Sequence, residues 1–152
     1  MKKFLILMLI GVSFYQWATE QNNSATLIDH KVQSTTNNVN NISDSTIENA
    51  YRNKQSDVQV NGIGKVIKLL RDDNKGSRHQ KFILRLSSGQ TLLIAHNIDL
   101  APRIDSLSTG DQVNFYGEYE WNNKGGVVHW THKDPNGHHI DGWLKHNGRI
   151  YQ

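Results

Sequence analysis

The chain has 152 residues and a formal charge of +3, from 17 Lys and Arg against 14 Asp and Glu. This length fits one ordinary domain, and so small a net charge does not indicate a polybasic nucleic-acid or membrane binder. There is no cysteine, which excludes disulfide scaffolds, cysteine-ligated zinc, iron–sulfur clusters and thiol nucleophiles. Hydrophobic residues make up 36% of the chain, below the roughly 45% usual for a compact domain, so part of the chain is expected to lie outside any core.

The first residues have the pattern of an export signal. Lys2 and Lys3 precede an apolar run from Phe4 to Phe14, which is too short to span a bilayer comfortably. Ala18 is a small residue near the expected cleavage point, but no A-x-A pattern accompanies it. We therefore interpret residues 1–19 as a signal peptide or, if uncleaved, an N-terminal membrane anchor. The predicted location is exported, either periplasmic or secreted.

The next segment is polar and without periodicity. Residues 20–46 are dominated by Asn, Ser, Thr and Gln, a composition that cannot offset the entropy lost on ordering, so they are predicted to form a disordered linker. The domain is placed at residues 47–152. Ser45 and Glu48 match a helix-capping box, which predicts a short helix ending near Gln55.

The rest of the chain predicts a mainly all-β domain. Five strands are indicated, at 58–70, 79–86, 91–96, 113–121 and 127–132, and Asn147-Gly148 predicts a final hairpin. Three strands, a short helical connection from Asn97 to Leu107 and two more strands are the order of a five-stranded, OB-fold-like Greek-key barrel. An SH3-like barrel is the alternative.

Two details of the strands are predicted. Apolar residues change parity around Gly62 and Gly64, which indicates a bulge or coil that lets the first strand serve two parts of the barrel. In the hairpin between the second and third strands, pairing Leu86 with Thr91 places Lys81 opposite His96.

Barrel closure fixes which strand ends meet. A ring of five strands must contain one parallel pair, and in the order 1-2-3-5-4 that pair is the third and fifth strands. We therefore expect His79, His96, His132 and the loop through Asp134 to share one end of the barrel.

Histidines supply the first candidate site. Seven of the eight lie after Asp57, and neutral histidine is a common metal ligand. His96, His132 and Asp134 are the predicted ligands of a divalent metal such as zinc. The alternative is that these histidines are solvated loop residues or pack on a sheet face.

A second constellation could carry catalysis. Arg78 offers a fork for a phosphate or carboxylate, His79 a proton-transfer group and Asn97 a donor to a developing oxyanion, with Asp134 converging on them. In the alternative reading, Arg78 pairs with Asp72 or Asp73 of its own loop, and Asn97 caps the following turn.

Aromatic residues supply the third candidate. Trp130 and Tyr116 could form a stacking platform for bases or sugars, with Arg78 and Lys81 as the cationic contacts of a ligand. Such aromatic residues are more often part of a core.

Several motifs carry a family resemblance. The quoted stretches are Asp72 to Gln80 (DDNKGSRHQ), Ala95 to Arg103 (AHNIDLAPR), Phe115 to Trp121 (FYGEYEW) and His129 to His132 (HWTH). Together they resemble a family of small exported bacterial proteins known as a domain of unknown function, over about ninety residues. A weaker similarity, in strand order and in the Asn97 to Arg103 segment, is to staphylococcal-nuclease-type OB-folds, which implies fold rather than mechanism because the full acid and arginine set of that family is not found.

Three functional hypotheses follow. The leading one is an envelope domain that binds nucleic acid, another phosphate-bearing ligand or a glycan at a barrel end lined by His, Arg and Asp. The second is a metal-dependent phosphodiesterase or nuclease-like hydrolase. The third is a histidine-based metal-binding or pH-sensing protein.

Overall fold

The structure, a computed structural model, describes residues 28–35, 38 and 42–152. The predicted signal segment lies outside these residues. Within the range predicted to be a disordered linker, residues 28–35, 38 and 42–46 are helical, which departs from the expectation for those residues. The chain divides into two compact units, residues 1–39 and 40–152. Of the helices in the described part of the chain, none combines the length and apolarity needed to cross a membrane.

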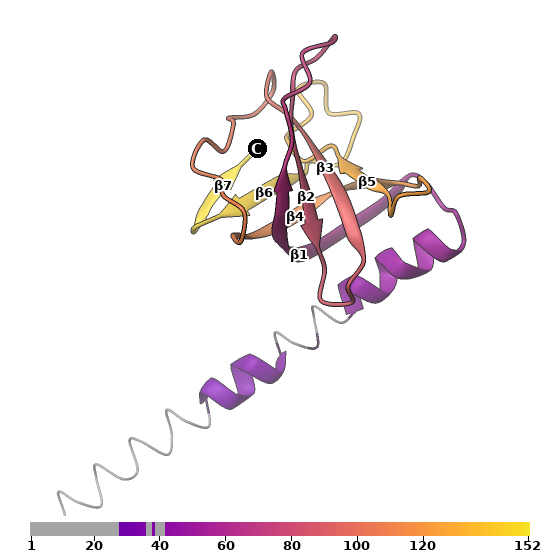
Figure 1. The fold of residues 1–152 in the computed structure, drawn as a ribbon, viewed down its shortest axis with the longest axis vertical. Coiled ribbons are helices and arrows are strands. Elements are labelled where there is room, and N and C mark those ends of the chain that lie inside the picture. Colours follow the sequence, from indigo (N-terminus) through magenta and orange to yellow (C-terminus); the bar gives the residue numbers. More distant parts are fainter. Residues whose placement is uncertain (1–27, 36–37, 39–41) are drawn as a thin grey trace, which may run out of the picture. The chain divides into compact units, whose positions relative to one another are not determined.

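Residues 58–151 build a closed barrel with an added hairpin (Figure 1). The strands are β1 (Val58–Leu69), β2 (His79–Arg85), β3 (Thr91–Asn97), β4 (Gln112–Glu120), β5 (Val127–His129), β6 (Trp143–His146) and β7 (Arg149–Tyr151). The sheet order is β1-β2-β3-β5-β4-β6-β7, and β1 also pairs with β4, which closes the first five strands into a ring. β3 and β5 are parallel, so the predicted all-β, OB-like barrel and its parallel pair are confirmed.

The added hairpin is also as predicted. β6 and β7 extend the sheet from β4, and the turn residues Asn147 and Gly148 both have positive φ, 48° and 79°. Two consecutive positive φ values are the mark of a type I′ turn, which explains the Asn-Gly pair.

β1 serves two sides of the barrel, but the predicted change of parity is wrong. It pairs with β4 over residues 58–65 and with β2 over residues 65–69. Val60 and Val66 are both buried and share one parity, while Leu69 is 45% exposed. The register shift falls between Val66 and Lys68. The glycines leave room for core side chains, since a Cβ at Gly62 would lie 2.7 Å from the Phe115 ring.

The predicted register of the β2–β3 hairpin is off by one residue. Arg85 pairs with Thr91, so Lys81 faces Ala95 and Gln80 faces His96. The loop is shorter than expected because the Leu86 N–H donates to the Gln90 carbonyl, and Gly89 adopts a φ of 90°. A three-residue loop with glycine in the left-handed region is a common hairpin form.

A helix covers one end of the barrel. Ile47 and Ala50 of helix 42–52 join the core cluster, and the Asp44 carboxylate accepts hydrogen bonds from Ser87 and Ser88 in the β2–β3 turn. The capping box predicted at Ser45 is wrong, because residues 42–44 are already helical.

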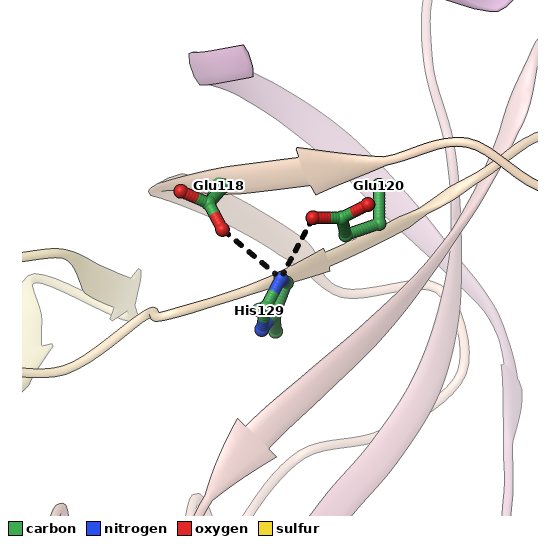
Figure 2. A group of neighbouring side chains, drawn as sticks. All are labelled: Glu118, Glu120 and His129. Carbon is green, nitrogen blue, oxygen red and sulfur yellow. Dashed lines mark ion pairs between the residues drawn. The ribbon is translucent and has the colours of Figure 1, made fainter. Parts of the chain in front are cut away.

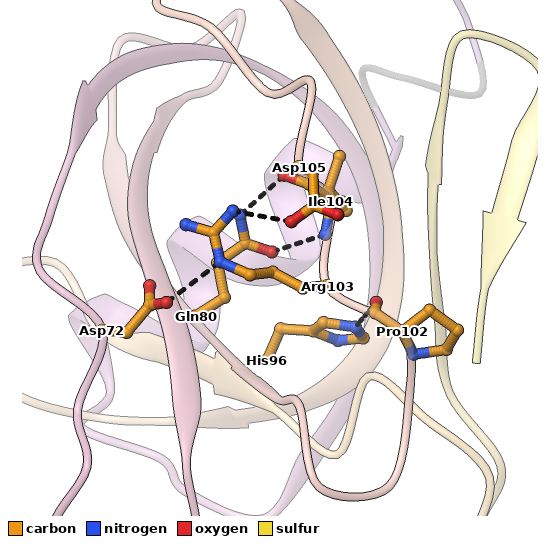
Figure 3. Close-up of polar contacts among 7 residues, drawn as sticks. All are labelled: Asp72, Gln80, His96, Pro102, Arg103, Ile104 and Asp105. Carbon is orange, nitrogen blue, oxygen red and sulfur yellow. Dashed lines mark hydrogen bonds and ion pairs between the residues drawn. The ribbon is translucent and has the colours of Figure 1, made fainter.

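The connection between β3 and β4 closes the opposite end. Ile104 is fully buried, and its backbone forms two hydrogen bonds with the side-chain amide of Gln80 (Figure 3). Arg103 pairs with Asp72 at 2.9 Å and with Asp105 at 3.1 Å. These contacts tie the connection to β2 and to the loop that precedes it.

Candidate functional site

A pocket of about 190 Å³ lies at the end of the barrel where β2 begins and β3 and β5 end. The lining residues are Ser77, His79, Ala95, Asn97, Leu100, His129, Trp130 and His132. Ala95 and Asn97 alternate with buried β3 residues, so the pocket is on the outer face of the barrel. His79 and His132 thus share one barrel end, as the strand order predicted.

Backbone contacts fix the tautomers of these two histidines. Nδ1 of His79 lies 2.8 Å from the Ser77 carbonyl, and Nδ1 of His132 lies 2.7 Å from the Lys133 carbonyl. A carbonyl oxygen can only accept, so both Nδ1 atoms must carry a proton. In each neutral ring Nε2 is then the unprotonated nitrogen. Neither Nε2 has a hydrogen-bond partner within the described part of the chain, so both are available to a ligand as acceptors.

His96 is buried inside the barrel end rather than in the pocket. Its Nε2–H donates to the Pro102 carbonyl at 3.2 Å (Figure 3). Its Nδ1 lies 2.9 Å from the Thr131 hydroxyl. Burial is the main cause that lowers the pKa of His96 to about 4. The ring is therefore neutral at pH 7 and accepts from Thr131, and both nitrogens are occupied.

Asp134 stabilises its own loop. Its carboxylate accepts backbone hydrogen bonds from Asn136, His138 and His139, and these bonds, the one from Asn136 foremost, hold the pKa of Asp134 below its usual value. In residues 28–35, 38 and 42–152, the ligand atoms of His96, His132 and Asp134 do not come within metal-binding distance of one another.

Arg78 and Asn97 both bond to Asp99. The Arg78 guanidinium lies 2.6 Å from Asp99, whose backbone N–H donates to the Asn97 side chain. The predicted turn cap by Asn97 is therefore present, while the alternative pairing of Arg78 with Asp72 or Asp73 is wrong. Asp72 instead forms an ion pair with Arg103, and Asp73 forms one with Lys81 at 3.3 Å. Asn97 lines the pocket, but Arg78 and Lys81 do not.

Trp130 ends β5 earlier than predicted. The strand stops at His129, because Trp130 has a φ of 51°, in the left-handed region that non-glycine residues rarely adopt. Its indole stacks on the imidazole of His139, with ring centroids 4.2 Å apart and planes at 5°. Tyr116, which was grouped with Trp130 as a platform, instead contacts Trp143.

Three side chains that were not predicted as a site gather across β4 and β5 (Figure 2), and His139 reaches them from the loop after β5. Glu118 is the direct cross-strand partner of His129, and its Oε1 lies 3.4 Å from His129 Nε2. Glu120 Oε1 is 3.9 Å from the same nitrogen. Glu118 Oε2 accepts a 2.7 Å hydrogen bond from His139. The alternation along β4, with both glutamates on the outer face, was the sequence signal for this group.

The protonation of His139 follows from its partners. Nδ1 faces the Ile140 carbonyl and Nε2 faces the Glu118 carboxylate, so both nitrogens donate and the ring is an imidazolium. Burial alone would lower the pKa of His139, but the bonds to Glu118 and Ile140 and the neighbouring carboxylates together raise it.

Comparison with known proteins gives a family for the chain. No curated protein matches the sequence. A family model described as "Protein of unknown function (DUF3465)" matches residues 30–152. The match covers the barrel with its N-terminal helix and C-terminal hairpin, and it agrees with the resemblance seen in the motifs. The chain therefore belongs to the DUF3465 family.

Proposed function

We propose that the barrel is a binding domain for a small, hydroxyl-rich ligand of the glycan class, held in the pocket at its outer face. The observation that carries this proposal is the pair of fixed tautomers at His79 and His132. Each leaves an unprotonated Nε2 as an acceptor, and sugar hydroxyls are donors that can satisfy such nitrogens. Asn97 and Ser77 add further polar groups to the lining.

Charge favours a neutral glycan over a phosphate-bearing ligand. Arg78 and Lys81, the two cations predicted to contact a ligand, are paired with Asp99 and Asp73 and lie outside the pocket lining. Two carboxylates, Glu118 and Glu120, lie next to the lining residue His129. The negative charges of these two carboxylates would repel a phosphate group bound beside His129.

Size limits the ligand to one small unit. A volume of about 190 Å³ is below the ~300–1,000 Å³ of pockets that enclose drug-sized molecules. Trp130 and Leu100 give the pocket an apolar side, and such a surface suits the face of a sugar ring. A longer glycan would place one residue here and extend over the outer surface.

The test is calorimetric titration of the full chain with a panel of mono- and disaccharides, inorganic phosphate and nucleotides. We expect saccharide binding that weakens at least tenfold in His79→Phe, which keeps a ring but removes both nitrogens. Arg78→Ala should leave the affinity unchanged. Binding of phosphate or nucleotide alone, lost in Arg78→Ala, would reject the glycan proposal in favour of an anion site.

We also propose that the protein is exported, on the strength of Lys2, Lys3 and the apolar run that follows. Cell fractionation of a bacterial host expressing the chain with and without residues 2–19 tests this. The full chain should be found in the envelope or medium and the truncated chain in the cytoplasm.

A further inference from the structure

We infer that Glu118, Glu120 and His129 form a binding site for a divalent transition-metal ion, with His139 as the positioning residue for Glu118. This site is distinct from the predicted set of His96, His132 and Asp134. The metal proposal does not depend on the glycan proposal, although His129 also lines the pocket. The inference stands on strand register, ligand geometry, charge and one unpartnered buried nitrogen.

Strand register brings the three side chains to one spot. Glu118 and Glu120 are two residues apart on β4, so both side chains point away from the barrel core. His129 is the cross-strand partner of Glu118 on the neighbouring strand. Side chains paired this way have their Cβ atoms about 5 Å apart, and β-strands hold such positions more rigidly than loops do.

The distances suit a small cation. The three ligand atoms lie within 4.8 Å of one another. Ligand atoms about 2.0 to 2.2 Å from a zinc ion at tetrahedral angles are about 3.3 to 3.6 Å apart. The 3.4 Å between Glu118 Oε1 and His129 Nε2 already fits, and the 3.9 Å to Glu120 needs only a small side-chain rotation.

His129 Nε2 lacks the partner that its burial requires. The atom is inaccessible to solvent and has no hydrogen bond, although two carboxylates lie near it. Buried polar atoms are nearly always satisfied, so each exception calls for an explanation such as an absent ion.

The charges around the site favour a cation. The Glu118 and Glu120 carboxylates lie together here, and the only ion pair of Glu120 in the described residues is the long one to His129. His139 bonds Glu118 through Oε2, which leaves Oε1 directed at His129. A hydrogen bond to the far oxygen of a ligating carboxylate is the usual way in which proteins orient a metal ligand.

The donor set selects the class of ion. One imidazole with two carboxylates suits zinc or manganese, whereas calcium and magnesium prefer oxygen ligands alone. Three protein ligands leave at least one position for water or another ligand. The side chains of Glu120 and His129 are each about one-third exposed, at 32% and 33%, so the group lies at the protein surface and only a small side-chain movement is needed for an ion to reach His129 Nε2.

The experiment uses the full, untagged chain, freed of metal and titrated with zinc by calorimetry, and with cobalt(II) by visible absorption. We expect one strong site per chain and a cobalt spectrum of low coordination number. Glu120→Gln and His129→Gln should each weaken zinc at least tenfold and remove that spectrum. His139→Gln should weaken zinc by roughly ten- to a hundredfold, with the spectrum kept.

Two controls separate this site from adventitious binding. His138→Gln removes an exposed loop histidine, and Glu48→Gln makes the same acid-to-amide change on the helix, so both should keep full zinc affinity. Circular dichroism and thermal melting check the fold of each variant. Zinc binding that persists unchanged in Glu120→Gln, or that disappears in His138→Gln, would overturn the inference, as would zinc uptake no greater than that of a buffer control.

Discussion

The side-chain amide of Gln80 and the backbone of Ile104 are joined by two hydrogen bonds. Gln80 Nε2 donates to the Ile104 carbonyl at 2.9 Å, and the Ile104 N–H donates to Gln80 Oε1 at 2.8 Å. Both residues are buried, at 3% and 0% exposure. The pair ties the connection between β3 and β4 to β2, and so closes the barrel end beside the pocket.

Replacing Gln80 by Met should destabilise the domain. The variant keeps the shape of the side chain but leaves a buried N–H and a buried carbonyl without partners, each costing about 1–3 kcal/mol. We expect the free energy of unfolding in urea to fall by ~2–5 kcal/mol. Gln112→Met, at an exposed position of β4, should change it little. Equal stability of the two variants would show that the Gln80 amide is not needed.

His96 should make stability depend on pH in a defined window. Its pKa is about 4 when folded and 6.5 as the ordinary value, so between these values the unfolded chain binds a proton that the folded chain does not. Stability is then full above about pH 6.5 and falls as the pH drops toward 4, by up to ~3 kcal/mol. Urea unfolding at a series of pH values measures this loss.

The matched variant for that series is His96→Gln, which keeps a donor toward the Pro102 carbonyl. Other histidines contribute to the same pH range, so the informative quantity is the difference between the two proteins. The variant should lose less stability than the natural chain on acidification. Parallel curves for the two would assign the pH dependence to other groups.

Gly142 should not tolerate a side chain. A Cβ there would overlap the carbonyl oxygens of Trp130 and Tyr116, which are backbone atoms and cannot rotate away. Gly142→Ala should therefore cost about 1–3 kcal/mol or more and disturb the loop that carries Trp130. The comparison is Gly137→Asn in the same loop, where no atom lies within 4 Å and asparagine suits the φ of 66°. Thermal melting of the two variants measures whether Gly142→Ala is the less stable.

Topology was predictable because it follows from simple constraints. Apolar and polar residues alternate along residues 113–121, which indicates a strand with one buried face. The Asn147-Gly148 pair likewise indicates a tight hairpin turn. Once five strands are to close into a ring, counting requires one parallel pair, which placed His79 and His132 at the same barrel end. Neither step needs knowledge of side-chain contacts.

The site was less predictable because side-chain partners depend on exact register. One residue of error in the β2–β3 hairpin came from Gly89, whose positive φ shortens the loop. Arg78 had two acidic candidates in its own loop, Asp72 and Asp73, whereas its partner Asp99 is brought to it only by the folded connection after β3. Asp134 was assigned to a metal, but its position at the start of a tight turn gives its oxygens to backbone N–H groups instead.

The group around Glu118 was missed for a related reason. His129 is the last residue of β5, and the strand ends there because Trp130 adopts a left-handed conformation. The sequence pattern predicted a strand through to His132, and His132, not His129, was predicted as a metal ligand. The stack of His139 on Trp130, at 4.2 Å, arises from a loop that returns to the sheet, and sequence spacing does not indicate such a contact.

The most direct test of the central claim is the tautomeric state of the pocket histidines, measured by long-range proton–nitrogen NMR of the full chain above the usual histidine pKa of about 6.5. We predict that His79 and His132 both carry their proton on Nδ1, with Nε2 unprotonated, and that added saccharide shifts the Nε2 resonances. Protonated Nε2 atoms in both rings would contradict the account, because the pocket would then present donors where the proposal requires acceptors.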